Sequence, residues 1–207
     1  MRLESLHISC CNGLTQLPYS MRSLKFLQSL RIEECSPLCI LPEWLGELHA
    51  LKDITIRRCD SLSNLPPSVQ HLMTLQTLEL SYCTALTQLP ECLAELRSLH
   101  TLRIQHLPSL SNLPRSLENL TSLQKFEIVD CDAFHQLPDC SMCRLTSLEM
   151  LTIWGCPGIM SLPDWIKGLT TLQELYISDC PDLVRRCKRG EGVDWHLISH
   201  VPCLRIP

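Results

Sequence analysis

The chain has 207 residues, of which 45% are hydrophobic and 19% charged, and its formal net charge is −4. This balance is typical of a soluble protein and gives no indication of nucleic acid or an acidic membrane as a partner. No apolar run reaches the length of a transmembrane helix, and the first residues have no continuous apolar core of the kind found in secretory signals.

The fourteen cysteines are the most unusual feature of the composition. In a short secreted chain they would indicate a disulfide framework. Without a secretory signal we expect a reducing compartment, in which thiols stay free. The one glycosylation sequon, Asn119-Leu120-Thr121, weakly favours secretion, but it lies in a repetitive frame that produces such a triplet by chance. We therefore predict a cytoplasmic location, with nuclear or membrane-peripheral pools as further options.

Leucines mark a repeat along the whole chain. They lie at positions 3, 27, 51, 75, 99 and 123, and at 148 and 172 after one inserted residue near 139–143. Each begins a unit of the form L-x-x-L-x-I-x-x-C-x-x-L-x-x-L-P-x-x-L-x-x-L-x-x. A period of 24 residues is typical of a solenoid, in which each unit buries its apolar face against the next.

The two halves of each unit predict two kinds of local structure. The alternating L-x-I half suits a short strand with one buried face, and stacked copies of it form a parallel sheet. The Pro-x-x-Leu-x-x-Leu half favours a short helix or 3-10 turn, with proline at its first position because no backbone donor is needed there. Acidic residues follow several of these prolines, where a helix N-terminus favours negative charge. They are Glu43, Glu91, Asp139 and Asp164.

Seven cysteines occupy one position of the repeat. They are Cys11, Cys35, Cys59, Cys83, Cys131, Cys156 and Cys180, and Leu107 takes this place in the fifth unit. The unit resembles the leucine-rich repeat, which has an asparagine or cysteine at this position. There the side chain turns inward where the strand ends. A small, weakly hydrogen-bonding thiol suits such burial, so packing accounts for these seven better than metal binding does.

The predicted fold is an α/β solenoid, a leucine-rich-repeat horseshoe of about eight 24-residue repeats over residues 1–183. The parallel sheet lines its concave face, and the short helical or 3-10 turns lie on the convex face. Residues 184–207 are predicted to form a C-terminal cap, in which Trp195, Leu197 and Ile198 cover the last repeat and residues 204–206 add a strand. The N-terminus has no comparable polar cap, so we expect a fragment or a truncated gene product.

Motifs of catalysis do not occur in the sequence. It contains neither a Gly-x-x-x-x-Gly-Lys phosphate loop nor a Gly-x-Ser-x-Gly nucleophile elbow. Glu33 and Glu34 are adjacent on a strand, so their side chains point to opposite faces and do not form an acid/base pair. We predict no enzymatic activity, no catalytic residues and no cofactor.

Two groups of cysteines and histidines contain some of the ligands that zinc prefers. The first is the motif Cys140-Ser-Met-Cys143 with Cys131 and His135 upstream, and the second is the tail with Cys180, Cys187, His196, His200 and Cys203. Neither supplies two well-spaced ligand pairs, so we predict no metal site, with zinc in the tail as the alternative. The tail also carries a basic cluster, interpreted as the solvated side of the cap. It consists of Arg185, Arg186, Lys188 and Arg189.

The residues beside and between the buried pair of each strand are expected to face the concave solvent. These triplets are Ser5/His7/Ser9, Ser29/Arg31/Glu33, Asp53/Thr55/Arg57, Thr77/Glu79/Ser81, Thr101/Arg103/Gln105, Lys125/Glu127/Val129, Met150/Thr152/Trp154 and Glu174/Tyr176/Ser178. Since the leucine frame is constant while these positions differ, they predict a mixed recognition surface.

Two parts of this surface are candidate partner sites. The first is an apolar and aromatic patch near the C-terminal end, because aromatic residues often anchor interfaces. It consists of Met150, Thr152, Trp154, Glu174 and Tyr176. The second is a charged stripe of Arg31, Arg57 and Arg103. The alternatives are that Trp154 and Tyr176 pack on the tail and that the arginines form an ordinary solvated face.

The repeats and the tail together resemble the C-terminal region of plant nucleotide-binding leucine-rich-repeat disease resistance proteins. The segments Trp154-Gly155-Cys156-Pro157 and Ser178-Asp179-Cys180-Pro181 match the I-x-x-C-P-x-L habit of that family. The tail from Leu183 to Pro202 resembles the closing segment of its coiled-coil members, especially those of grasses.

This resemblance implies an intracellular immune receptor whose repeats sense a pathogen effector or a modified host protein. In that family the repeats also restrain a nucleotide-binding domain, whose motifs do not occur in this chain. The alternative is a stand-alone intracellular scaffold for signalling proteins, similar to the plant Ras-group leucine-rich-repeat proteins, which would not need the tail. Either class implies protein partners and no nucleic acid.

Overall fold

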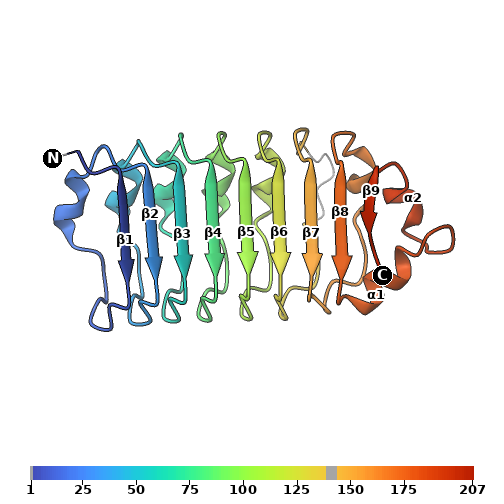
Figure 1. Cartoon of the computed structure of the whole chain (residues 1–207), viewed down its shortest axis with the longest axis horizontal. Coiled ribbons are helices and arrows are strands. Elements are labelled where there is room, and N and C mark those ends of the chain that lie inside the picture. Colours follow the sequence, from blue (N-terminus) through green and yellow to red (C-terminus); the bar gives the residue numbers. More distant parts are fainter. Residues whose placement is uncertain (1, 139–143) are drawn as a thin grey trace.

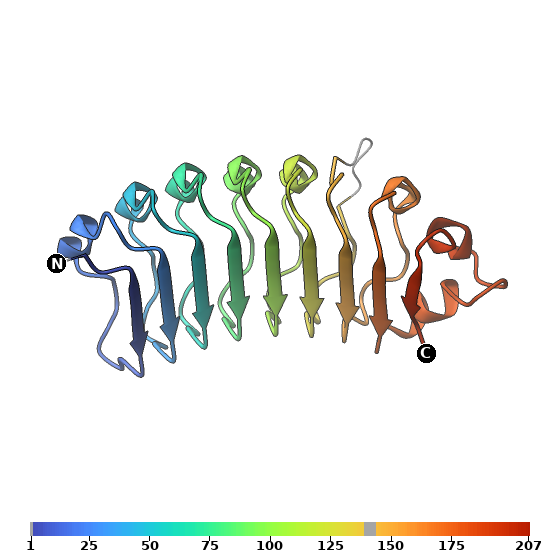
Figure 2. The ribbon, with the colours of Figure 1, turned by 45° about the horizontal axis from the view of Figure 1, so that its top comes forward.

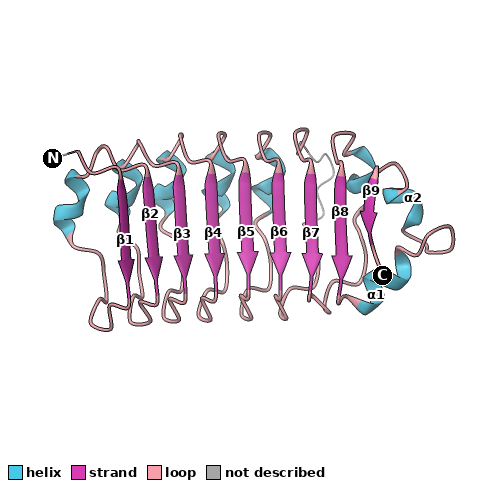
Figure 3. Cartoon of the chain, in the orientation of Figure 1, coloured by secondary structure: helices cyan, strands magenta, loops and turns pink. Residues whose placement is uncertain are grey.

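The computed structural model describes residues 2–138 and 144–207. Within these ranges, nine strands form one parallel sheet in chain order, as Figures 1 and 3 show. They are β1 (Ser5–Ser9), β2 (Ser29–Glu33), β3 (Asp53–Arg57), β4 (Thr77–Ser81), β5 (Thr101–Gln105), β6 (Lys125–Val129), β7 (Met150–Trp154), β8 (Glu174–Ser178) and β9 (Cys203–Arg205). From β1 to β8 each residue lies opposite its counterpart in the next repeat, as Ser5 does opposite Ser29.

The strands form where the sequence predicts them, because two apolar residues alternate within each five-residue stretch. In β5, Leu102 and Ile104 are fully buried, while the residues beside them reach the inner face. The outer members of the eight predicted triplets coincide with the ends of β1 to β8. Two triplet members depart from the expected exposure: Ser81 is 1% exposed and Val129 8%. The parallel solenoid sheet is therefore confirmed.

Short 3-10 helices lie on the opposite side of the solenoid from the strands (Figure 2). They are η1 (Tyr19–Ser23), η2 (Glu43–Glu47), η3 (Pro67–His71), η4 (Glu91–Glu95), η5 (Arg115–Asn119) and η6 (Asp164–Gly168). The expected place of proline is wrong for most of them, because it precedes the helix in an extended conformation, as Pro42 does with φ −75° and ψ 152°. Its carbonyl accepts the first helical hydrogen bond, from the N–H of Leu45. In η3 a second proline, Pro67, does occupy the first position.

Three of the four acidic residues predicted at helix starts do begin a 3-10 helix, and the fourth, Asp139, lies outside the described residues. The three are Glu43, Glu91 and Asp164. The Glu91 carboxylate accepts hydrogen bonds from the backbone N–H groups of Arg115 at 3.4 Å and Ser116 at 3.1 Å. Burial alone would raise the pKa of Glu91, but the bonds from Ser116 and Arg115 outweigh it and hold the pKa below its usual value. Glu91 therefore caps the helix of the following repeat.

The cysteine column lies inside the solenoid, where the strands end. The thiol of Cys83 donates to the carbonyl of Ser81 at 3.5 Å, and most of the other column thiols make the same bond. Burial raises the pKa of Cys59 to about 12 and that of Cys83 to about 11, so both thiols stay protonated at neutral pH and are poor nucleophiles and ligands. The cysteines of the described ranges are free, whereas Cys140 and Cys143 lie outside those ranges.

The C-terminal segment covers the last repeat with two helices, α1 (Pro181–Arg186) and α2 (Trp195–Ile198), and with β9. Strand β9 pairs with β8 and begins one residue earlier than expected. Leu197 and Ile198 are buried against the core, and Trp195 is half-buried. Helix α1 runs across the boundary predicted between residues 183 and 184, and that division of the chain stays a prediction.

One ion pair holds this segment together. Arg186 donates to the two carboxylate oxygens of Asp194 at 2.8 and 2.7 Å, and the N–H of Leu162 donates to the same carboxylate at 3.1 Å. Asp194 is only 4% exposed. Burial alone would raise the pKa of Asp194, but the bonds from Arg186 and Leu162 outweigh it and hold the pKa below its usual value. Arg186 is thus half-exposed but paired within the tail, which corrects its assignment as a purely solvated residue.

Four of the other basic and metal-type residues of the tail have local partners. Arg185 pairs with Asp182 and Lys188 with Glu191, both at 2.6 Å. The ring N–H groups of His196 and His200 donate to the backbone carbonyls of Val193 and Leu169. Across residues 2–138 and 144–207, no three histidine, cysteine or acidic side chains gather as a metal-binding group.

Candidate interaction surface

The inner face of the sheet presents its exposed side chains in rows, because the register is constant and alternate residues point to one face. The middle row runs through His7, Arg31, Thr55, Glu79, Arg103, Glu127, Thr152, Tyr176 and Arg205. Neighbours in a row are about 4.8 Å apart at the backbone. Side chains one repeat apart in the sequence are therefore direct neighbours in space.

The C-terminal patch forms one small hollow of about 160 Å³. Four of the five predicted residues line it, together with Leu175 and Arg205 of the tail strand; the four are Met150, Thr152, Glu174 and Tyr176. Trp154 is 39% exposed and Tyr176 37%, so both offer aromatic surface to a partner. The fifth patch residue, Trp154, lies on the same strand as Met150 and Thr152, two residues beyond Thr152.

The tail touches only one side of this patch. Arg205 of β9 lies opposite Tyr176 of β8, so the tail strand forms a wall of the hollow and leaves the tyrosine partly exposed. The Trp154 indole N–H donates to the carboxylate of Asp179 in the neighbouring repeat, not to the tail strand. The interpretation of Trp154 and Tyr176 as binding anchors stays a prediction.

Two of the three predicted arginines are paired with acidic neighbours. Arg31 donates to Glu33 of its own strand at 2.6 Å. Arg103 lies between two glutamates of its row, 3.9 Å from Glu79 and 3.1 Å from Glu127. These carboxylates offset the positive charge of the arginines, so this part of the surface alternates in charge.

Arg57 lies in another row and another environment. Its guanidinium carbon is 5.4 Å from the centre of the Tyr82 ring, a cation–π distance. Arg57 Nε and the hydroxyl of Ser81, which lies opposite it on β4, are buried without a hydrogen-bond partner among the described residues. The structure therefore separates Arg57 from Arg31 and Arg103, and the three do not line up as one stripe.

A second feature lies just beyond the strand ends, in a column of residues with left-handed backbone. One residue per repeat has φ between 50° and 62° at this point. The column is Cys10, Glu34, Arg58, Tyr82, His106, Asp130, Gly155 and Asp179. This conformation extends the backbone hydrogen bonds between neighbouring strands by one residue. The N–H of Tyr82, for example, donates to the carbonyl of Gln105 at 3.0 Å. Such φ values are rare for tyrosine and arginine and ordinary for glycine and aspartate.

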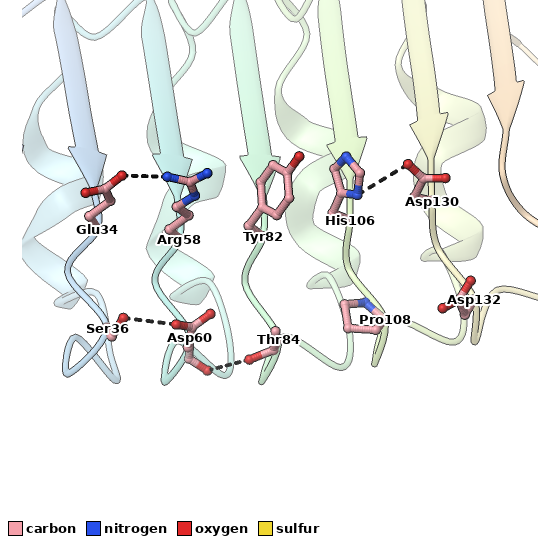
Figure 4. A pocket seen from close by; sticks show the side chains of 10 residues that line it. All are labelled: Glu34, Ser36, Arg58, Asp60, Tyr82, Thr84, His106, Pro108, Asp130 and Asp132. Carbon is pink, nitrogen blue, oxygen red and sulfur yellow. Dashed lines mark hydrogen bonds and ion pairs between the residues drawn. The ribbon is translucent and has the colours of Figure 1, made fainter.

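The side chains of this column contact one another in sequence, as Figure 4 shows. Arg58 pairs with Glu34 at 2.7 Å, and its guanidinium lies 5.5 Å from the centre of the Tyr82 ring. The rings of Tyr82 and His106 stack with their centres 4.1 Å apart, and His106 Nδ1 lies 3.3 Å from the Asp130 carboxylate. The result is a continuous ladder of side chains across five repeats.

A groove of about 540 Å³ runs along this ladder. The residues two positions further along the chain form its other wall; they are Ser36, Asp60, Thr84, Pro108 and Asp132. Sequence reasoning placed the recognition surface on the strands alone and missed this groove. The signal was present in part, because the residue before each column cysteine varies from unit to unit, as the predicted triplets do.

Comparison with known proteins places this geometry in a family. The family model described as a leucine-rich repeat region matches residues 2–154. The chain belongs to the leucine-rich-repeat family. No curated protein sequence is significantly similar to it.

Solved leucine-rich-repeat structures have the same fold. The leucine-rich repeat domain of the type III effector XopL is 25% identical with a TM-score of 0.79, and the match covers 99% of this chain and 76% of that one. A Leptospira interrogans leucine-rich-repeat protein is 23% identical with a TM-score of 0.54, covering 87% and 59% of the two chains. A plant peptide hormone receptor, RGFR1 in complex with RGF2, is 23% identical with a TM-score of 0.55, covering 87% and 35%.

As a leucine-rich-repeat solenoid, the chain is a protein-interaction module. Its buried thiols and paired charges are structural, and its exposed rows and groove are the surfaces on which a partner can act. None of the helices in residues 2–138 and 144–207 is long and apolar enough to cross a bilayer.

Proposed function

We propose that this leucine-rich-repeat module is the recognition region of an intracellular plant immune receptor of the coiled-coil nucleotide-binding class. It senses a pathogen effector or a modified host protein, and in the full receptor it restrains the nucleotide-binding domain. The tail carries this proposal, because its sequence resembles the closing segment of that receptor class and its helices cover the last repeat. The cytoplasm is the location that this function requires.

The C-terminal patch is the proposed contact surface for the sensed protein. Its hollow combines the exposed ring of Tyr176 with the carboxylate of Glu174 and the guanidinium of Arg205, and the exposed ring of Trp154 lies on the neighbouring strand outside the hollow. Aromatic side chains at the centre of an interface contribute most of its binding energy, and polar groups at the rim orient the partner. No comparable pair of exposed aromatic residues lies on the other described strands.

The receptor assignment is tested by the complete transcript that encodes this chain. We expect an open reading frame that continues upstream of Met1 into a nucleotide-binding domain with a Gly-x-x-x-x-Gly-Lys phosphate loop. A stop codon upstream, followed directly by the first repeat, would instead favour the stand-alone scaffold.

The patch is tested by the double substitution Trp154→Ala/Tyr176→Ala. We expect cross-linking of the chain to its partner, measured by quantitative mass spectrometry in the source tissue, to fall at least about tenfold. Thermal stability should change little, since both rings are more than a third exposed. The matched control is Tyr19→Ala/Phe26→Ala, which removes two exposed aromatic rings from the first repeats and should leave the cross-links unchanged. A large fall in melting temperature with the patch variant would show that the rings support the fold.

A further inference from the structure

The groove at the strand ends is a second site, separate from the aromatic patch. We propose that it binds an extended, basic segment of a partner protein, with arginine or lysine side chains directed at its carboxylates. This inference does not rest on the proposed receptor function, because it concerns other residues and another kind of ligand.

The shape of the groove fits an extended chain. It crosses five repeats, from Glu34 to Asp130, between the side-chain ladder and the outer wall (Figure 4). Four strand spacings of about 4.8 Å give a length of roughly 19 Å. An extended peptide advances about 3.3 Å per residue, so about six residues fill the groove.

The negative charge of the groove favours a positively charged ligand. Its walls carry four carboxylates and a single arginine, Arg58. Arg58 is paired with Glu34 at 2.7 Å, so it neutralises that carboxylate. The other three, Asp60, Asp130 and Asp132, have no lysine or arginine partner among the described residues. A basic side chain is therefore the complement that this groove lacks.

Two of these three carboxylates, Asp60 and Asp130, have polar partners in the groove wall. Ser36 donates its hydroxyl to Asp60 at 2.9 Å, and His106 lies against Asp130 at 3.3 Å. Asp130 is also fixed because the carboxylate fills the space that a Cβ at Gly155 would occupy. Acceptors that are already oriented lose less conformational entropy when a cation binds.

The apolar part of the groove suits the stems of long basic side chains. The stacked rings of Tyr82 and His106 and the ring of Pro108 line its middle. Lysine and arginine bury their methylene stems on such surfaces and keep the charged group at a polar edge. Here Asp60 and Asp132 supply that edge on the outer wall.

Acidic residues also occur beyond the groove toward the C-terminus. Asp179 occupies the same column position two repeats after Asp130, and Asp182 follows it in α1. Asp179 accepts the indole N–H of Trp154. Asp182 is paired with Arg185, so the unpaired acidic character is confined to the groove itself.

The experiment measures binding of a labelled peptide of alternating arginine and glycine, about six residues long. Fluorescence anisotropy follows the titration, with glutamate–glycine and glutamine–glycine peptides of equal length beside it. We expect saturable binding of the arginine peptide alone, which weakens as salt is added. Binding of the glutamate peptide, or no binding of the arginine peptide, would overturn the proposal.

Charge at the groove is tested by the triple substitution Asp60→Asn/Asp130→Asn/Asp132→Asn. We expect the dissociation constant of the arginine peptide to rise about tenfold. The matched control, Glu4→Gln/Glu95→Gln/Glu149→Gln, removes three exposed carboxylates outside the groove and should change it by less than about twofold. Equal weakening by the two variants would show general electrostatic attraction and would sink the proposal.

Shape is tested without any change of charge by Thr84→Trp, which fills the middle of the groove. Thr84 is exposed, so the larger ring can be accommodated without disturbing the core. We expect it to abolish saturable binding, whereas Thr87→Trp, at an exposed position outside the groove lining, should leave the dissociation constant unchanged. Unchanged binding by Thr84→Trp would place the peptide elsewhere. The Trp154→Ala/Tyr176→Ala variant should bind the arginine peptide normally, so the two proposals fail separately.

Discussion

The first and last repeats of this solenoid have the same leucine frame but different burial. In β1, Leu6 and Ile8 are only half-buried, whereas the equivalent Leu175 and Ile177 of β8 are 1% and 0% exposed. Strand β1 has one neighbouring strand in the sheet, and β8 has two. The comparison shows that a repeat acquires its core from the elements on both of its sides, not from its own sequence.

The cap at the C-terminal end uses different chemistry from the repeats. Like the repeats, the tail is joined by a strand ladder, from β8 to β9, and by apolar packing of α2, but it adds an ion pair in which Asp194 is buried and Arg186 half-exposed. Removing the Asp194 carboxylate should cost more than a lost surface contact, because the buried N–H of Leu162 is left without an acceptor. The contacts between repeats and the contact between the tail and the last repeat should therefore respond differently to mutation and to pH.

The largest expected effect comes from leucine truncation in the middle of the array. Leu102→Ala removes a side chain that is fully buried between two repeats, and we expect a loss of about 2–5 kcal/mol in the free energy of unfolding. The equivalent Leu6→Ala in β1 removes a half-buried side chain and should cost about 1 kcal/mol. Urea denaturation of the two variants measures the difference. Equal losses would contradict the dependence on two neighbours.

The next effect concerns the cap. Asp194→Ala leaves the buried N–H of Leu162 and the half-exposed Arg186 without their acceptor, and we expect a loss of about 1–3 kcal/mol. The loss should be local, seen as faster amide hydrogen exchange in residues 162–207 and unchanged exchange in β2 to β5. The control Asp182→Ala removes an exposed carboxylate of α1 and should change exchange little. Uniform acceleration along the chain would show that the cap and the array unfold as one unit.

The same ion pair predicts a pH dependence. Because the folded-state pKa of Asp194 is lowered, its stabilisation is fully present above the unfolded value of about 3.9. It is lost as the pH falls through the lower folded-state value. The difference in unfolding free energy between the wild type and Asp194→Asn should therefore shrink below about pH 4. Because the comparison is a difference between two variants, the contributions of the other carboxylates cancel. A difference that stays constant down to pH 2 would contradict the lowered pKa of Asp194.

Much of the fold could be predicted because every repeat has the same spacing of apolar residues. The spacing of the leucines set the strand positions, and the column cysteines followed from the same frame. The positions of the prolines and of Arg186 were mispredicted, because each depends on which neighbour accepts a hydrogen bond, a choice that the sequence pattern leaves open. Proline was expected at the first position inside the 3-10 helix. It lies one residue earlier instead, because its carbonyl accepts the first hydrogen bond of that helix.

The candidate site was predictable only in part, for a related reason. Met150, Thr152, Glu174 and Tyr176 meet because they share rows of one sheet, which the repeat period dictates. The stack of Tyr82 on His106 depends on left-handed backbone at the strand ends. The presence of a tyrosine or a histidine in a sequence does not predict that conformation. Arg57 is a different case, since the repeat register itself places it in another row from Arg31 and Arg103.

The smallest expected effect tests a contact between two repeats in the interior of the array. Glu91→Ala removes the acceptor for the N–H groups of Arg115 and Ser116 at the start of η5, and we expect a loss of about 0.5–1 kcal/mol. The loss is small because these N–H groups lie near the surface and water replaces the carboxylate. Glu95→Ala, an exposed residue of the same helix η4, is the matched control. If both variants melt at the wild-type temperature, the Glu91 carboxylate contributes nothing to the junction of η4 and η5, and leucine packing and the backbone ladder account for it.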